Sequence, residues 1–388
     1  MTNIIIVGAG IIGLSIAREL ILNKRGNVII LEKEHEAGMH ASGRNSGVIH
    51  SGINQKPGSI KARMCVDGSL MLRNYCKEKS IPMNECGTIV IANNENQIKT
   101  LDKLMEMGTA CGVSNLKFLS ESELKEKEPN SSGIKALFSP NGAAVDSEKL
   151  VKTMALDVIS LGGKILTGEK VVGISGLKVK TEKNEYTANH IINCAGLYAD
   201  KVAHMMNEGL DFKVIPFRGE YMEVSNVSIN SMIYQTPDLR FPFLSVHMTK
   251  ETDGKIIAGP TAVLSFGRES YNKEINIKES FEFLTSLRFF LLVVQPGFFS
   301  MAFQAFKMSF SKYSFCKEIQ KVSPRVIPGL IKPFRSGIRA QMVDKYGRFV
   351  DDHVVTFKKS YTNVLNCVSP GMTCSMAFAK YVNQNLIL

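Results

Sequence analysis

The order of apolar and polar residues at the start of the chain predicts a strand, a helix and a second strand. Residues 4–7 form an unbroken β-branched run, Ile-Ile-Ile-Val, which is typical of a strand buried in a parallel sheet. Residues 14–22 then show the pattern of a helix, and residues 28–31 form another short apolar run. We therefore expect the chain to begin with two parallel strands that are joined by a helix.

A glycine-rich turn, Gly-Ala-Gly-Ile-Ile-Gly, connects the first predicted strand to the helix. Gly8 allows a tight turn, Gly10 lets the backbone approach a pyrophosphate, and Gly13 lets the helix pack against the strand. The helix N-terminus also offers free N–H groups to the phosphates. Glu32 follows the second strand, 19 residues after Gly13, where an acid can bind ribose hydroxyls. Together these features predict a dinucleotide-binding site.

Three further segments favour FAD over NAD, a choice that the glycine motif leaves open. Residues 42–47 form a small, polar, glycine-rich loop that suits a second phosphate or the edge of a flavin. Residues 188–193 read as a buried strand that runs into Ala195-Gly196, where the backbone can approach a nucleotide closely. Residues 364–367 read as a late strand that leads to a helix from about Cys374. The N-terminus of that helix is available to a flavin carbonyl that becomes anionic on reduction.

These segments and the glycine motif together define the expected FAD site. We expect no metal in it, since no cysteine pair has the Cys-x-x-Cys spacing of a zinc or redox site. The expected FAD contacts are Gly8, Gly10, Ile12, Gly13, Glu32, Lys33, Ser42, Gly43, Arg44, Asn45, Ser46, Val171, Ala195, Gly196, Gly371, Met372 and Thr373.

The rest of the chain predicts a second domain that is interleaved with the first. Residues 216–266 alternate between apolar and polar positions and carry turn signals, which indicates an antiparallel sheet that roofs the flavin. The predicted fold class is therefore α/β with an α+β substrate domain, in which a Rossmann-like FAD-binding domain is interleaved with an antiparallel-sheet domain. The FAD-binding domain is expected over 1–80, 146–212 and 335–388, and the substrate domain over 81–145 and 213–334. Further helices are expected over 95–112, 121–129 and 149–161, and further strands over 87–92, 164–167, 171–174 and 177–181.

One stretch, residues 289–306, has no charged residue over 18 positions and is rich in Phe, Leu and Val. Pro296-Gly297 breaks it in the middle, so we reject a membrane-spanning helix. Two interpretations remain. The default is a pair of helices buried against the substrate domain or in a dimer interface; the other is a peripheral membrane contact across residues 288–321. In the second, basic side chains reach anionic headgroups: Arg288, Lys307, Lys312, Lys317 and Lys321.

Charge and cysteine content limit the possible partners and the cellular compartment of the protein. The net charge is +11, but Lys and Arg are scattered and form no stripe with aromatic residues, which argues against specific nucleic-acid binding. Several of the eight cysteines have apolar neighbours, and we interpret them as buried thiols in a reducing compartment. The N-terminus has no basic region and no cleavage site, so we expect no signal peptide. We expect a cytoplasmic protein, with a place at the inner face of the membrane as the alternative.

The segments around the predicted cofactor site resemble the D-amino-acid-oxidase-like superfamily of FAD enzymes, over essentially the whole chain. Within it, the chain is most similar to the L-2-hydroxyglutarate oxidase/dehydrogenase family. This resemblance implies the oxidation of a small, anionic 2-hydroxy acid, with L-2-hydroxyglutarate as the first choice, and FAD that is held without a covalent bond. The stretches that carry it are Asn-Ser-Gly-Val-Ile-His-Ser-Gly (45–52), Pro-Gly-Ser-Ile-Lys-Ala (57–62), Pro-Phe-Arg-Gly-Glu-Tyr (216–221), Phe-Pro-Phe-Leu-Ser-Val-His (241–247), Gly-Ile-Arg-Ala-Gln (337–341) and Asp-Asp (351–352).

The chain departs from the family pattern at three places near the expected flavin and substrate. Arg44 stands where the better-known members have His, and Thr261 stands where they have Asn. Residues 369–373, Ser-Pro-Gly-Met-Thr, replace a Ser-Pro-Ala-Ala-Thr pattern. These changes leave a different hydroxy acid, or an amino acid, open as the substrate.

The reaction that the resemblance implies needs a base. The α-hydrogen of the substrate leaves as hydride to flavin N5, and the hydroxyl proton must go to a side chain such as histidine, whose ordinary pKa is about 6.5. His247 and His50 lie in strand-like, family-matching segments that are expected to face the flavin. We favour His247 as the base and leave His50 open. The other histidines have plainer interpretations: His35, His190 and His204 on the surface, His40 packed beside the flavin loop, and His353 paired with Asp351-Asp352.

The substrate carboxylate needs a cation, and arginine suits it because its planar fork binds both oxygens. Arg339 is the first candidate, since the resemblance implies that an arginine of this late strand reaches the substrate or the flavin. Arg218 is a second candidate that could instead pair with Glu220, and Arg268 reads equally as a surface residue. Tyr221 could supply a hydroxyl to the site.

The leading hypothesis is therefore an FAD-dependent 2-hydroxy-acid dehydrogenase or oxidase that passes its electrons to a quinone or to oxygen. An amine or amino-acid oxidase on the same scaffold is the alternative, because the fold does not decide between the two substrates. A flavoprotein that binds nucleic acid is a distant third hypothesis.

Overall fold

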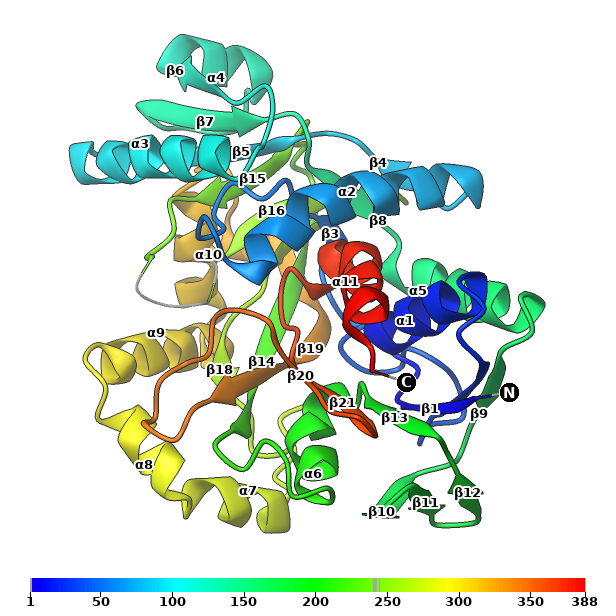
Figure 1. Cartoon of the computed structure of the whole chain (residues 1–388). Coiled ribbons are helices and arrows are strands. Elements are labelled where there is room, and N and C mark those ends of the chain that lie inside the picture. The colour runs from blue at the N-terminus through cyan, green and yellow to red at the C-terminus, as the bar shows by residue number, and fades with distance from the viewer. Residues whose placement is uncertain (1, 240–242, 244, 388) are drawn as a thin grey trace.

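The computed structural model describes residues 2–239, 243 and 245–387, and a six-stranded sheet forms the core of one half of it (Figure 1). The strand order is β20-β21-β13-β1-β2-β9, and neighbouring strands are parallel except for β20 and β21. Strands from both ends of the chain thus lie in one sheet. The strands are β1 (Asn3–Val7), β2 (Asn27–Leu31), β9 (Lys164–Leu166), β13 (His190–Asn193), β20 (Val354–Phe357) and β21 (Tyr361–Asn366).

Helices cover one face of this sheet, and a small sheet covers the other. The helices of the first face are α1 (Ile11–Leu22), α2 (Ile60–Glu78), α5 (Ser147–Ser160) and α11 (Gly371–Asn385), which pack together in Figure 1. On the opposite face lie the antiparallel strands β10 (Val171–Ser175), β11 (Lys178–Thr181) and β12 (Glu185–Thr187), with helix α6 (Ala199–His204). The predicted strand–helix–strand unit is confirmed, although its helix begins at Ile11 and not at Leu14 because Gly10, in extended conformation, already forms the N-cap.

A second, nine-stranded sheet forms the other half of the molecule. Its path is β18-β14-β17-β16-β15-β5-β7-β6, and β19 pairs with β14. The strands are β5 (Thr88–Ala92), β6 (Lys117–Ser120), β7 (Lys135–Ser139), β14 (Lys213–Val224), β15 (Met232–Gln235), β16 (His247–Lys250), β17 (Ile256–Gly259), β18 (Val263–Leu264) and β19 (Ile331–Val343). The strands within 216–266 pair antiparallel as predicted, but β15 joins β5 in parallel, so the whole sheet is mixed.

Smaller elements complete the fold. Strands β3 (Val48–Ile49), β8 (Ala143–Val145) and β4 (Met83–Asn84) form a short sheet, and helices α3 (Glu95–Ala110) and α4 (Glu121–Lys127) pack near the edge of the nine-stranded sheet. Short 3₁₀ turns occur at η1 (Gly196–Tyr198) and η2 (Pro328–Leu330). The expected domain boundary at residue 335 falls inside β19, and the division into two domains stays a prediction.

The apolar stretch that begins at residue 289 lies in two of four consecutive helices. These are α7 (Ile277–Leu284), α8 (Leu287–Val293), α9 (Phe298–Phe310) and α10 (Lys312–Gln320). Within the described part of the chain, no single helix has the length and apolar character to cross a membrane, whereas α8 and α9 meet that test as a pair bent by 89°. Gly297, at a φ of +83°, makes the break between them. Their inner faces pack around Phe298 and Leu292, but many outer side chains are exposed, so the default expectation of burial holds for one side only.

Several polar residues that were expected at the surface are buried. His190 has no exposed surface, and its Nε2 lies 2.9 Å from the hydroxyl of Thr362. Arg268 is also buried, because it pairs with Asp200. The His353 ring packs edge-on against Phe378, and the hydrogen bond to the Asp352 carboxylate comes from the backbone N–H of His353, not from its ring.

All eight cysteines are free thiols; Cys86, Cys111 and Cys367 are half-buried and the other five are buried.

Candidate active site

A cavity of about 820 Å³ lies between the two large sheets. The carboxyl ends of β1, β2, β13 and β21 open into it, as do residues of β14 and β19. In open parallel sheets the ligand binds at the carboxyl ends of the strands. The cavity wall takes residues from both ends of the chain, from Val7 to Thr373.

The glycine-rich turn forms one end of this cavity. Gly8 has a φ of +105°, and a Cβ there would lie 2.6 Å from the carbonyl oxygen of Cys194. A Cβ on Gly13 would lie 2.1 Å from the carbonyl oxygen of Gly8, so α1 can approach β1 only without a side chain at that position. The Ser42 hydroxyl accepts the N–H of Ile11 at 2.9 Å, and no side-chain cap covers the helix N-terminus from Gly10. The first turn of α1 therefore presents a narrow, backbone-lined cradle that fits a pyrophosphate.

Glu32 lies beside this cradle at the end of β2. Its carboxylate accepts the N–H of Ala9 at 2.7 Å and the N–H of Glu34 at 3.0 Å, which fixes its position in the cavity wall. A carboxylate offers about four acceptor sites, so two backbone bonds leave capacity for ribose hydroxyls. Glu32 therefore lies beside the cradle with room for further hydrogen bonds, and its contact with a ribose stays a prediction.

Most of the other expected FAD contacts also line the cavity. Gly43 does not line it, because it turns back to donate its N–H to the Gly38 carbonyl. Gly13 lies behind Gly8, in the packing role predicted for it. At the far end, α11 begins next to the cavity without a side-chain cap at Pro370. The contacts that line the cavity are Gly8, Gly10, Ile12, Glu32, Lys33, Ser42, Arg44, Asn45, Ser46, Val171, Ala195, Gly196, Gly371, Met372 and Thr373.

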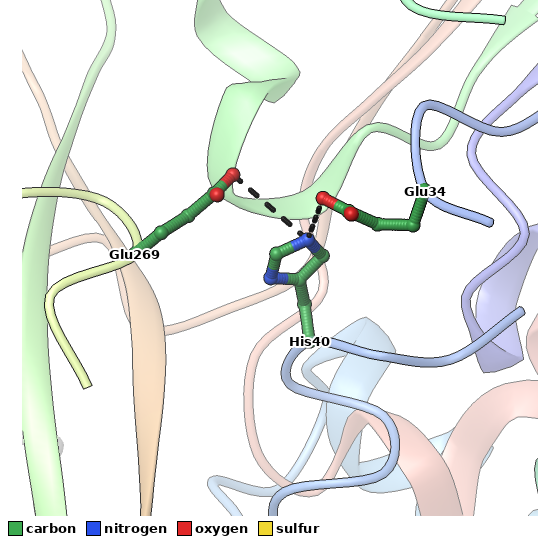
Figure 2. Close-up of side chains that lie close together, drawn as sticks. All are labelled: Glu34, His40 and Glu269. Carbon is green, nitrogen blue, oxygen red and sulfur yellow. Dashed lines mark hydrogen bonds and ion pairs between the residues drawn. The ribbon is translucent and has the colours of Figure 1, made fainter. Parts of the chain in front are cut away.

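A charged cluster crosses the cavity wall near Glu32 (Figure 2). Figure 2 shows Glu34 and Glu269 approaching His40 Nε2 from two sides. The distances to this nitrogen are 2.9 Å from Glu34 and 3.8 Å from Glu269. These three side chains have the spacing of a metal site, but Lys33 contacts both carboxylates, at 2.6 Å from Glu269. Although burial opposes ionisation, this ammonium holds the pKa of Glu34 and of Glu269 below the usual range. We therefore interpret the cluster as an ion-pair network that ties the loop after β2 to the segment before α7.

The opposite end of the cavity holds the predicted catalytic residues. His247 begins β16, His50 follows β3, Tyr221 lies in β14 and Arg339 lies in β19, and all four line the cavity. Strands far apart in sequence thus bring two histidines, a phenol and a guanidinium to one place. The Arg339 guanidinium also lies 5.1 Å from the centre of the Phe243 ring.

His247 has one ring nitrogen fixed and the other available. Its Nδ1 donates to the carbonyl of Ser245 at 3.2 Å, which leaves Nε2 without a proton in the neutral ring. Among the described residues, Nε2 is buried and has no hydrogen-bond partner. Burial, and to a smaller extent the neighbouring His50 and Arg339, lowers the pKa of His247 to about 3, although the hydrogen bond that His247 donates to the Ser245 carbonyl opposes this shift. His247 is therefore a neutral acceptor at ordinary pH.

His50 and Tyr221 are neutral for related reasons. Burial, then the charges of Arg339 and Lys61, lowers the pKa of His50 to about 4. Burial raises the pKa of Tyr221, and the guanidinium groups of Arg335 and Arg339 partly offset this rise. Burial also lowers the pKa of Arg339, because its guanidinium is removed from water. In such surroundings an anionic ligand stabilises the guanidinium more strongly than it would in water.

The structure does not bring Arg218 or Arg268 to the cavity. Arg218 is buried behind the wall, where its Nε donates to Glu220 at 3.2 Å and its Nη1 donates to the carbonyl of Ser270. Arg268 donates to both carboxylate oxygens of Asp200, at 2.7 and 2.9 Å. Both arginines hold the loops around the cavity. Of the three arginines that the sequence predicts for the substrate, Arg339 is the one that lines the cavity, at the end that holds the two histidines.

Sequence reasoning missed several residues of the wall. Phe217 and Phe243 line the cavity and form an aromatic contact, with ring centres 5.0 Å apart. Thr261, already noted as a departure from the family pattern, also lines it, and its hydroxyl accepts the N–H of Glu220 at 3.0 Å. Tyr198, whose hydroxyl donates to Glu269 at 2.8 Å, also lines it. Tyr198 lies only two residues after Gly196, so its place next to a predicted contact was the available signal.

Comparison with known proteins identifies the family. Residues 3–384 match the family of FAD dependent oxidoreductases described as DAO. The chain belongs to this family. The family resemblance, the fold class and FAD as the cofactor of the family, all expected from the sequence, are thereby confirmed. The residues at the cradle, at Glu32 and at the start of α11 fit FAD, and these side chains would hold it.

Three curated relatives that match nearly the full chain carry the name L-2-hydroxyglutarate dehydrogenase. The chain is 36% identical to the L-2-hydroxyglutarate dehydrogenase of Indibacter alkaliphilus, over 97% of this chain and 96% of that protein. It is 34% identical to the mitochondrial L-2-hydroxyglutarate dehydrogenase of Homo sapiens, over 97% and 87% of the two chains. It is 32% identical to the L-2-hydroxyglutarate dehydrogenase of Escherichia coli strain K12, over 98% and 92%.

Solved structures support the fold. The structure of L-α-glycerophosphate oxidase from Mycoplasma pneumoniae, with FAD bound, superposes with a TM-score of 0.79 at 24% identity, over 99% of this chain and 94% of that chain. Glycine oxidase from Geobacillus kaustophilus superposes with a TM-score of 0.76 at 16% identity, over 99% and 95%. The same fold thus carries enzymes named for a hydroxy compound and for an amino acid.

Proposed function

We propose that this protein oxidises L-2-hydroxyglutarate to 2-oxoglutarate, with FAD as the immediate electron acceptor. The proposal rests on two residues that lie at one end of the cavity, a neutral His247 and Arg339. Among the described residues, Nε2 of His247 has no hydrogen-bond partner, so it is available to the substrate. A 2-hydroxy acid needs this combination, because it must lose a hydroxyl proton while its carboxylate is held. The curated relatives, named L-2-hydroxyglutarate dehydrogenase, support the choice of substrate.

Each side chain at this end of the cavity has a proposed role. Arg339 binds the α-carboxylate through its planar fork, and Tyr221 donates its phenolic proton to the same end of the substrate. His247 takes the hydroxyl proton at Nε2. His50 stays neutral beside it, because burial and the cationic surroundings disfavour its protonation. When bound, FAD supplies the two-electron acceptor for the α-hydrogen, which leaves as hydride.

The arrival of the substrate changes the electrostatics in the direction that catalysis needs. In the empty site, burial and Arg339 keep the pKa of His247 low, so the ring is a weak base. The substrate carboxylates bring negative charge against Arg339 and towards His247. An opposite charge within a few ångströms raises the pKa of a histidine, so His247 becomes a stronger base when the substrate is bound.

The test is reduction of the bound flavin without oxygen. The purified holoprotein is mixed with L-2-hydroxyglutarate, D-2-hydroxyglutarate, other 2-hydroxy acids and amino acids, and the rate of flavin bleaching is recorded. We expect rapid bleaching by L-2-hydroxyglutarate alone, and a loss of about 10² to 10⁴ in that rate in His247→Asn. Faster bleaching by an amino acid would replace this proposal by the amine or amino-acid oxidase alternative. The electron acceptor, a quinone or oxygen, follows from which of the two reoxidises the reduced protein faster.

We further propose that helices α7–α10 contact the anionic inner face of a membrane from the cytoplasmic side. In Figure 1, α7, α8 and α9 lie together at one corner of the molecule (yellow). Their outward side chains are unusually apolar: Phe299 and Phe303 are 70% and 66% exposed. The exposed apolar and aromatic residues of this face are Ile277, Phe281, Leu284, Leu287, Phe290, Val294, Phe299, Phe303, Phe306, Phe310 and Tyr313.

Basic side chains frame this apolar face. Lys307 lies over the ring of Phe303 and Lys317 over the ring of Tyr313, at 6.0 and 4.7 Å, so cations and aromatic rings share one surface. The acidic residues Glu282 and Glu318 are already paired with lysines. A face with apolar and cationic residues, on a protein of net charge +11, fits anionic headgroups with acyl chains beneath.

Sedimentation with vesicles tests this contact. We expect the holoprotein to bind phosphatidylglycerol/phosphatidylcholine vesicles, to bind pure phosphatidylcholine weakly, and to be released by salt. The double variant Phe299→Ser/Phe303→Ser should weaken binding by about 100-fold or more, since burying each Phe contributes about 1.5–3 kcal/mol, or about 3–6 kcal/mol for the two. Leu156→Ser, 68% exposed on α5, is the matched control and should change nothing. Equal binding by the double variant, or a dimer in solution that the double variant abolishes, would overturn the proposal.

A further inference from the structure

Tyr234 lies directly behind His247 and outside the cavity lining. It belongs to β15, and the register of β15 and β16 places Tyr234 opposite His247. The two rings are stacked, with their centres 4.2 Å apart and their planes 10° from parallel. Both residues are buried. The imidazole therefore rests flat on the face of an aromatic ring.

This contact is held rigidly by the sheet. On its other side β15 pairs with β5, where Tyr234 is opposite Val90, so the tyrosine lies in the interior of the nine-stranded sheet. The Nδ1 bond to Ser245 fixes the rotation of the imidazole about its own axis, and the stack fixes its plane. Nε2 can then point in one direction only.

The hydroxyl of Tyr234 does not explain why a tyrosine stands at this position. In the part of the chain that the structure describes, this buried oxygen has no hydrogen-bond partner. A buried hydroxyl without a partner destabilises a fold. The feature of Tyr234 that contacts the active site is thus its ring face, which carries the negative part of the aromatic quadrupole.

We propose that Tyr234 is a positioning residue whose ring face stabilises the His247 imidazolium that forms when the substrate hydroxyl loses its proton. The inference rests on the proposed function, in which His247 is the base. In that step the substrate O–H bond breaks and an N–H bond forms at Nε2, while the carbon–oxygen bond becomes a carbonyl and the α-hydrogen departs with its electron pair to the bound FAD.

The surroundings of His247 otherwise oppose this positive charge. His50 and the Arg339 guanidinium both disfavour protonation of His247, and its burial removes water. Of the titratable groups that face His247, the neutral Tyr234 is the one that stacks its ring on the imidazole. Tyr221 lies near the hydroxyl of Tyr234. A cation that lies flat over an aromatic face in a water-poor site gains about tenfold in stability, which equals about one unit of pKa.

The matched variants are Tyr234→Phe and Tyr234→Leu. Phe keeps the ring face and removes the unpartnered hydroxyl, whereas Leu keeps an apolar side chain and removes the ring face. Flavin content and thermal unfolding of both variants report whether the fold and the FAD site are retained. His247→Asn in the same series reports whether His247 is the base at all.

The assay is anaerobic flavin reduction by L-2-hydroxyglutarate as a function of pH, with nitrogen-15 NMR of the labelled His247 ring in the complex with glutarate, which lacks the reacting hydroxyl. We expect Tyr234→Phe to behave like the parent. Tyr234→Leu should lower the limiting rate by several-fold with little change in the substrate concentration at half-rate, and should shift the acid limb and the NMR titration of His247 about one pH unit lower.

Two results would overturn the inference. One is an acid limb and a His247 titration in Tyr234→Leu that match the parent, since a purely structural role would lower the rate without moving either. The other is a Tyr234→Phe variant that is as impaired as Tyr234→Leu. A pH-independent, fully active His247→Asn would remove His247 as the base and this inference with it. The proposed function itself would fail only if L-2-hydroxyglutarate did not reduce the flavin of the parent protein, so the two failures are distinct.

Discussion

Asp200→Asn should destabilise the protein by about 3–5 kcal/mol, because it leaves a buried guanidinium without its counter-charge. Arg268 and Asp200 are 3% and 1% exposed, and two hydrogen bonds of 2.7 and 2.9 Å join them. Asp200 also accepts the N–H of Val214 at 3.0 Å. An asparagine of the same shape would direct an N–H group at the guanidinium N–H, so one of the two bonds would become a repulsion.

The expected change in melting temperature follows from chain length. Unfolding entropy is about 2.1 cal/mol/K per residue, or about 0.8 kcal/mol/K for 388 residues, so Tm should fall by about 4–6 °C. The pair also holds two parts of the cavity wall together, since Asp200 follows the Ala195-Gly196 turn and Arg268 precedes Glu269. FAD should therefore dissociate more readily from the variant.

Thermal unfolding by circular dichroism, with and without added FAD, measures this effect. Asp211→Asn removes the exposed carboxylate that pairs with Lys345 and is the control, with no expected change in Tm. The double variant Asp200→Asn/Arg268→Met should lose less stability than the two single variants combined, because it leaves no unpaired charge. A drop below about 1 °C in Asp200→Asn, or strict additivity in the double variant, would refute the reasoning.

The same pair predicts a pH dependence. Burial opposes ionisation of Asp200, but the Arg268 guanidinium outweighs it and holds the pKa of Asp200 below the usual range. A carboxyl group with a depressed pKa contributes stability above its unfolded pKa of about 3.9 and loses it as the pH falls further. The stability difference between the parent and Asp200→Asn should therefore shrink below about pH 4.

Three further outcomes are expected. Gly13→Ala should prevent FAD retention, because its Cβ would lie 2.1 Å from the Gly8 carbonyl oxygen; a yellow variant with parental flavin content would contradict this. Arg339→Lys should raise the substrate concentration at half-rate by about tenfold, since an ammonium cannot form the bidentate fork, whereas unchanged steady-state kinetics would count against Arg339 as the carboxylate ligand. Stability in urea should decline from about pH 6.5 towards pH 4, because burial keeps His50 and His247 neutral with pKa values of about 4 and 3 while the unfolded chain takes up protons; a flat profile that His247→Gln leaves unchanged would exclude this cause.

The N-terminal half of the cofactor site could be predicted from local sequence because its constraints are local. A positive φ at Gly8, a close contact at Gly13 and an acid at the end of β2 each depend on a few neighbouring residues. The fold class could be predicted for the same reason. A strand buried on both faces is a continuous apolar run, whereas a half-buried strand alternates between apolar and polar residues.

The rest of the site depends on contacts between distant segments. Arg218 and Arg268 could not be separated from Arg339 in sequence, because their partners Glu220, Ser270 and Asp200 become neighbours only when β14 and the segment before α7 pack together. Tyr234 gave no signal at all, since its contact with His247 depends on the register between two strands. The apolar helices were recognised, but which of their faces meets the core is set by tertiary packing.

The FAD cavity takes its wall from both ends of the chain, and this has a consequence for biosynthesis. The phosphate cradle around Gly8 leaves the ribosome first, whereas β21 and the start of α11 are made last. Until β21 arrives, β13 has an unpaired edge in the six-stranded sheet, which is a site of unwanted strand pairing. We therefore expect the flavin to be loaded only after translation ends, and a chain that stops before residue 371 to be found in aggregates and not as a partly active enzyme.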